Sequence, residues 1–165
     1  MKKLSVFLLA TAFALTASAA VNSKDRKTME KLGQGESSEV DLAKIVEPKA
    51  TSADVKEFAR RMISDHGKAF DKLERLAKEE KVSLKSGMDK EHKKFAATLA
   101  KEKLGAAYDR TYMAEMVKDH RKDKSDIDKA IKQTKNAELK AWEREALETV
   151  TGHLKMAEEI RAKLK

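Results

Sequence analysis

The stretch VKEFARRMISDHGKAFDKLERL (residues 55–76) decides the fold class. Its apolar residues recur at intervals of three and four, which places them on one face of an α-helix. One polar residue, His66, interrupts that face. The segment therefore predicts an amphipathic helix that packs against other helices and carries a histidine on its inner side. The stripe consists of Val55, Phe58, Ala59, Met62, His66, Ala69, Leu73 and Leu76.

The residues before this stretch predict one more helix and a turn. A helix from about Asp25 to Glu47 is expected to end before Pro48, because a residue that precedes proline disfavours helical geometry. Thr51, with Asp54 three residues later, predicts an N-cap for the second helix. The second helix is expected to end near residue 81.

The residues after it predict a loop, a short helix and two long helices. The loop covers residues 82–88, the short helix ends at Gly105, and a long helix covers residues 106–134. The last helix follows the turn at Lys135 and Asn136. No segment shows the period-two alternation of a strand. The sequence therefore predicts an all-α four-helix bundle with a short additional connecting helix. The two long helices carry inner stripes that include Met113, Met116, Val117, His120, Ile127, Ile131, Leu139, Trp142, Ala146, Val150 and His153.

The first 19 residues have the features of a secretory signal peptide. Two lysines precede an apolar run over residues 4–16, and small residues follow at 17–20. An uncleaved membrane anchor is the alternative, but the run is short for a bilayer span. We therefore expect a periplasmic or secreted protein with a single domain, residues 20–165, and no integral membrane span. The chain contains no cysteine, so its stability has to come from the core.

The charge pattern argues against a nucleic-acid partner. The formal net charge is +8, but lysine and arginine alternate with aspartate and glutamate, as in KDHRKDKSD (residues 118–126). Nucleic-acid-binding proteins concentrate their positive charge and often expose aromatic side chains. Neither feature is visible, so no nucleic-acid partner is expected. Because the chain is expected to be exported, an envelope protein is the expected class of partner.

Three of the four histidines lie on the inner stripes of three different long helices. At a rise of about 1.5 Å per residue, His66 lies roughly 25 Å from the Pro48 turn. By the same rise, His120 and His153 lie roughly 23 and 26 Å from the turn at residues 135–136. All three are thus near mid-height in helices about 43 Å long.

The first helix adds carboxylates at a similar height. Glu36 and Glu39 flank its apolar stripe, and Glu39 lies roughly 16 Å from the Pro48 turn. Three imidazoles and one carboxylate form a first shell suited to a transition metal. The sequence predicts a single zinc, copper or iron ion. The predicted ligands are Glu39, His66, His120 and His153.

Two other interpretations of the histidines stay open. They can form a buried polar network in a non-catalytic envelope stress or interaction module, or they can make the bundle sensitive to pH. His92, on the short helix, is expected at the rim of the bundle, and Asp65 and Asp119 are expected to pair outside the core. No nucleophile with its base, phosphate loop or acid–base carboxylate pair is visible, so the sequence predicts no particular reaction.

Several motifs resemble an exported bacterial family of unknown function, often labelled as membrane or outer-membrane proteins. The resemblance implies a ferritin-like bundle in which residues 82–105 connect two helical hairpins. The di-iron motif Glu-x-x-His is absent, because Ile63, Val117 and Val150 stand three residues before the histidines. Iron storage and oxygen activation are therefore not implied. The matching pieces are Glu39-Val40, Leu42-Ala43, residues 55–59, Asp65-His66, Tyr108-Asp109, Tyr112, Asp119-His120 and His153-Leu154.

Overall fold

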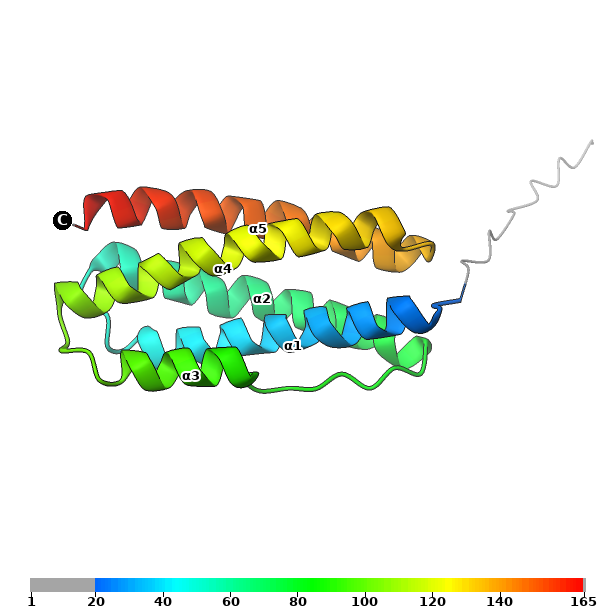
Figure 1. The fold of residues 1–165 in the computed structure, drawn as a ribbon, viewed down its shortest axis with the longest axis horizontal. Coiled ribbons are helices and arrows are strands. Elements are labelled where there is room, and N and C mark those ends of the chain that lie inside the picture. Colours follow the sequence, from blue (N-terminus) through cyan, green and yellow to red (C-terminus); the bar gives the residue numbers. More distant parts are fainter. Residues whose placement is uncertain (1–19, 165) are drawn as a thin grey trace, which may run out of the picture.

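The computed structural model describes residues 20–164, and these residues form an all-α helical bundle (Figure 1). Within that range the chain has no strand, and the predicted fold class is confirmed. The predicted signal peptide, residues 1–19, lies outside the described residues. Among residues 20–164, no helix combines the length and apolar character needed to cross a bilayer. The helices are α1 (Ser23–Val46), α2 (Ala53–Glu79), α3 (Lys90–Leu99), α4 (Ala106–Gln133) and α5 (Ala137–Lys163).

The long helices form two antiparallel hairpins. Helix α1 packs along α2, α4 packs along α5, and the hairpins meet mainly through α2 and α5. The end of α2 and the start of α4 lie at opposite ends of the bundle (Figure 1). An extended segment and α3 therefore return along α1 to the other end. This is the long connection between hairpins that the family resemblance implies.

Two local predictions about helix ends are wrong. Thr51 does not cap α2: the N-cap is Ser52, and the Ser52 side chain makes no capping hydrogen bond. The short helix α3 ends at Leu99 rather than at Gly105. Gly105 instead precedes α4 with φ of +124°, a backbone angle that favours glycine.

A carboxylate from another helix caps α2. Asp109, in the first turn of α4, accepts the backbone N–H of Thr51 at 3.1 Å and that of Ser52 at 2.7 Å. It also accepts the Thr51 hydroxyl at 2.7 Å. The Asp109 side chain is buried, so this cap ties the start of α4 to the start of α2. A tertiary contact has therefore replaced the local capping box.

The histidines divide the apolar core into two parts. In α2, His66 lies between Met62 of one hydrophobic cluster and Leu73 of the other. In α4, His120 lies between Val117 and Ile127 in the same way. The polar layer is thus in the middle of the bundle, enclosed by apolar residues on both sides.

Replacing Gly67 or Gly152 by alanine is expected to raise the free energy of unfolding by about 0.5–1 kcal/mol each, because glycine in a helix interior is that much worse than alanine. An added Cβ would meet no atom within 4 Å at either position. Urea denaturation measures the change. Gly33→Ala is the control. Its added Cβ would lie 3.0 Å from a Leu84 methyl group, so this variant is expected to gain less stability. A loss of stability in Gly67→Ala would contradict the prediction.

Candidate metal centre

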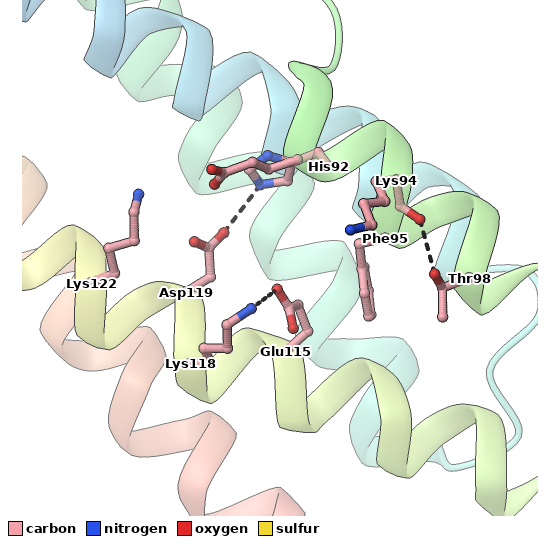
Figure 2. Close-up of a pocket in the computed structure, with 9 residues that line it drawn as sticks. His92, Lys94, Phe95, Thr98, Glu115, Lys118, Asp119 and Lys122 are labelled. Atoms are coloured by element: carbon pink, nitrogen blue, oxygen red, sulfur yellow. Dashed lines mark hydrogen bonds and ion pairs between the residues drawn. The ribbon is translucent and has the colours of Figure 1, made fainter.

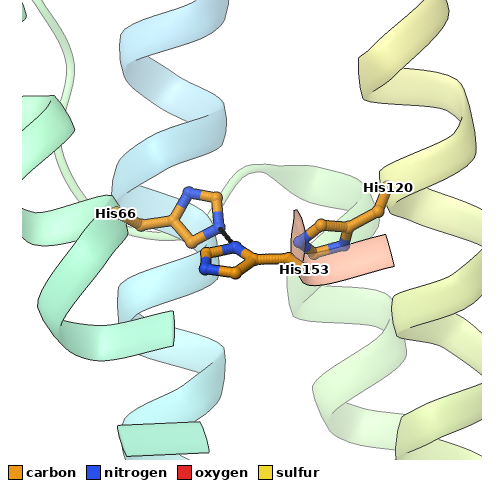
Figure 3. A group of neighbouring side chains, drawn as sticks. All are labelled: His66, His120 and His153. Carbon is orange, nitrogen blue, oxygen red and sulfur yellow. Dashed lines mark hydrogen bonds between the residues drawn. The ribbon is translucent and has the colours of Figure 1, made fainter. Parts of the chain in front are cut away.

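The three predicted histidines converge in the bundle core (Figure 3). His66 comes from α2, His120 from α4 and His153 from α5, and all three side chains are buried. One ring nitrogen of each lies within 4.8 Å of the corresponding nitrogens of the other two. His66 Nε2 is 3.3 Å from His153 Nδ1. We refer to these three residues as the histidine cluster.

The remaining nitrogen of each ring is held from outside the cluster. Histidine ligands of metal ions usually donate their second N–H to a carboxylate or a backbone carbonyl, which orients the ring. Each histidine here has such a partner. The nitrogens left to face one another are Nε2 of His66, Nε2 of His120 and Nδ1 of His153. The partners are Glu36 for His66 (2.6 Å), the Met116 carbonyl for His120 (2.9 Å) and Asp65 for His153 (3.0 Å).

At neutral pH the histidine cluster carries one positive charge, which lies on His66. Burial lowers the pKa of His66, but the charge and hydrogen bond of Glu36 outweigh burial and raise it to about 9. Burial and the positive charge of His66 lower the pKa of His120 to about 3 and that of His153 to about 4. At neutral pH, His66 is therefore an imidazolium paired with Glu36, and its Nε2–H donates to His153 Nδ1.

His120 is left with an unpaired nitrogen. Its Nδ1 donates to the Met116 carbonyl, and its Nε2 has no hydrogen-bond partner among residues 20–164. The His120 side chain is 0% exposed. A buried lone pair therefore faces the other two histidines, which is the arrangement expected of a metal ligand.

The fourth predicted ligand, Glu39, belongs to a different group. Its Oε1 lies 3.6 Å from His92 Nε2, and that nitrogen is 3.1 Å from Asp119 Oδ2. We refer to Glu39, His92 and Asp119 as the carboxylate cluster. Glu39 remains close enough to the histidine cluster for its charge to help raise the pKa of His66. The structure thus brings together three of the four predicted ligands and places Glu39 beside them.

Sequence reasoning missed the role of His92. Instead of lying at the rim, its side chain is only 11% exposed and lies between α1 and α4. Figure 2 shows the ring facing Asp119. Helical periodicity identifies the inner face of each long helix, but it does not tell where a short connecting helix packs. Asp65 and Asp119 each pair with a histidine of another helix. The expectation that both pair outside the core is wrong for Asp65, because its partner His153 is a buried residue of the histidine cluster.

The comparisons with known proteins show a shared fold through one solved structure and name no activity. The structure is similar to the crystal structure of a DUF305 fragment from Deinococcus radiodurans, with a TM-score of 0.78 and 12% sequence identity. The match covers 88% of this chain and 99% of that fragment, and at this identity it shows the fold alone. No curated protein matches the chain. The model of the DUF4142 family, a domain of unknown function, matches residues 10–160, and the chain therefore belongs to that family.

Proposed function

We propose that this protein is an exported helical bundle that binds one transition-metal ion through His66, His120 and His153. The observation that carries the proposal is the buried Nε2 of His120, which has no hydrogen-bond partner among the described residues. Leaving a buried polar atom unsatisfied costs about 1–3 kcal/mol. A metal ion at the centre of the cluster satisfies that nitrogen. It also replaces the hydrogen bond between the facing nitrogens of His66 and His153, which become ligands once the His66 Nε2 proton is released.

The spacing of the rings supports the same conclusion. Two nitrogens bound at about 2.0–2.1 Å to a tetrahedral ion lie roughly 3.4 Å apart. The facing nitrogens of His66 and His153 are already 3.3 Å apart. Imidazole ligands suit zinc, copper and iron. Because Glu39 lies in the other cluster, the fourth position falls to water or another small ligand. Metal retention in the periplasm is the role that this site fits, and the predicted signal peptide supports the location.

A second candidate function has an observation of its own. The two N–H groups of a protonated His66 donate to Glu36 and to His153 without any metal. This favours a non-catalytic envelope module in which the histidines form a structural polar layer. On that hypothesis the protein holds no metal and acts by contacting other envelope proteins.

Elemental analysis of the protein purified from the periplasm without an affinity tag separates the two candidates. The variant is the double replacement His66→Ala, His120→Ala, which removes two ligands. We expect the wild-type protein to hold about one more equivalent of zinc, copper or iron than the folded double variant. Met116→Ala is the matched control, because it opens a cavity one turn from His120 and leaves the backbone carbonyl in place.

The structural alternative predicts a different result. Equal metal content in the wild-type protein and the double variant, together with failed reconstitution with all three ions, would favour the polar layer. Circular dichroism shows whether the double variant is folded.

A further inference from the structure

We propose that Glu39, His92 and Asp119 form a second cation site, suited to a harder divalent ion such as Mn²⁺ or Fe²⁺. The three residues come from α1, α3 and α4, so the site lies where the connecting helix packs onto the bundle. The proposal does not depend on metal in the histidine cluster. It stands on the geometry, the buried carboxylate and the cavities of this region.

The donor atoms of the three side chains are spaced as metal ligands are. One atom from each lies within 4.8 Å of the atoms from the other two. His92 Nε2 is 3.1 Å from Asp119 Oδ2 and 3.6 Å from Glu39 Oε1. Ligands bound at about 2.1–2.2 Å to a common ion are separated by roughly 3.0–4.4 Å. An ion therefore requires little movement of these side chains.

The ring of His92 is held in position from the other side. Its Nδ1 is 2.9 Å from Asp89 Oδ1, and the same carboxylate oxygen accepts the His92 backbone N–H at 2.8 Å. Asp89 is the N-cap of α3, so the first turn of that helix fixes the ring. A histidine that is bound to a carboxylate through one nitrogen and faces other ligands with the second is the usual arrangement at metal sites.

Glu39 provides an independent indication that a cation belongs here. Its side chain is buried, with 1% of the residue exposed, and neither carboxylate oxygen has a hydrogen-bond partner among residues 20–164. Burying a carboxylate is costly unless it is paired and hydrogen-bonded, and the contact of Glu39 with His92 at 3.6 Å is an ion pair without a hydrogen bond. The Nε2 of His92, although close to Asp119, also lacks a hydrogen bond of acceptable geometry. A metal ion would satisfy all of these atoms together.

Two cavities give the site room and access. A cavity of about 70 Å³ is lined by Glu39, His92 and Asp119, and a liquid water occupies about 30 Å³, so an ion with a water ligand fits. A wider cavity of about 470 Å³ is also lined by His92 and Asp119, and Figure 2 shows the residues around it. The smaller cavity is also lined by His66, but neither cavity is lined by His120 or His153, and the wider cavity reaches no residue of the histidine cluster. The carboxylate cluster is therefore the more accessible of the two sites.

The donor set distinguishes the two sites chemically. Two carboxylates and one imidazole suit Mn²⁺ and Fe²⁺, whereas three imidazoles suit zinc and copper and bind Mn²⁺ weakly. Mn²⁺ is therefore a selective probe of the carboxylate cluster. Its free aqueous form has a strong electron paramagnetic resonance signal that disappears on binding.

The test is a titration of the metal-free protein with Mn²⁺, followed by electron paramagnetic resonance. We expect about one Mn²⁺ per chain, and at least tenfold weaker binding in Glu39→Gln and in Asp119→Asn. Both changes remove a charge and preserve the size of the side chain. Asp128→Asn is the matched control, because it removes the same charge from the same helix at a residue whose ion pair is with Lys124, away from the carboxylate cluster. Its affinity is expected to change less than twofold.

Two results would overturn the proposal: no bound Mn²⁺ in the wild-type protein, or equal weakening by Asp119→Asn and Asp128→Asn. If Glu39→Gln does not fold, the partly exposed Asp119 carries the test alone. The double variant His66→Ala, His120→Ala is expected to keep its Mn²⁺. The Mn²⁺ site can therefore be confirmed even if the histidine cluster holds no metal. Likewise, metal in the histidine cluster can be confirmed even if the carboxylate cluster binds no Mn²⁺.

Discussion

The affinity of the histidine cluster for Zn²⁺ is expected to rise about 100-fold between pH 6 and pH 8, or tenfold per pH unit. Zinc requires an unprotonated Nε2 on His66, but Glu36 raises the pKa of His66 to about 9. Below that pH the metal competes with a bound proton. Each rise of one pH unit lowers the proton concentration tenfold and so raises the apparent zinc affinity about tenfold. His120 and His153, with pKa values of about 3 and 4, are already neutral and add no dependence.

The shape of this profile is the diagnostic feature. Three histidines with an ordinary pKa near 6.5 would give an affinity that falls steeply below pH 6 and is level above pH 7. Competition with a chelator of known zinc affinity, repeated at each pH, measures the profile. Calorimetry in two buffers is expected to show about one proton released per zinc at pH 7.

The control for the pH dependence is Glu36→Gln. Without the carboxylate, the pKa of His66 loses its main raising influence and is lowered by burial. The affinity of this variant is expected to be nearly constant above pH 7. A level profile between pH 7 and 8 in the wild-type protein would contradict the assigned protonation of the cluster.

Replacement of Asp109 by alanine is expected to lower the free energy of unfolding by about 3 kcal/mol. Its buried carboxylate accepts the backbone N–H groups of Thr51 and Ser52 and the Thr51 hydroxyl. Hydrogen bonds to a charged group contribute about 1.5–3 kcal/mol each, although not additively. For a chain of this size the melting temperature is expected to fall by about 6–12 °C.

Urea denaturation of Asp109→Ala beside Asp54→Ala tests this cap. Asp54 lies in the first turn of α2, but it is exposed and forms a surface ion pair with Lys163. Its replacement is expected to cost roughly 0.5 kcal/mol or less. Asp109→Asn is expected to be intermediate, because the amide keeps one acceptor oxygen. Similar losses in the two alanine variants would show that the contacts of Asp109 do not stabilise α2.

The placement of the predicted site residues could be foreseen where it depended on local periodicity, but not where it depended on packing. The positions of His66, His120 and His153 follow from their stripes and from the helical rise, so their meeting was predictable. The sequence could not predict which of Glu36 and Glu39 contacts the histidines, because both flank the stripe of α1. Glu36 reaches His66, whereas Glu39 faces α3.

The sequence by itself determined the helices, their approximate limits and the height of the histidine layer. It could do so because hydrophobic periodicity, proline and glycine act on the nearest few residues. Only the tertiary structure decided where α3 packs, and with it the contacts of His92 with Glu39 and Asp119. It also decided that Asp109, 58 residues away, caps the helix that begins after Thr51. Contacts of this kind depend on how whole helices rotate and pack, which no local pattern records.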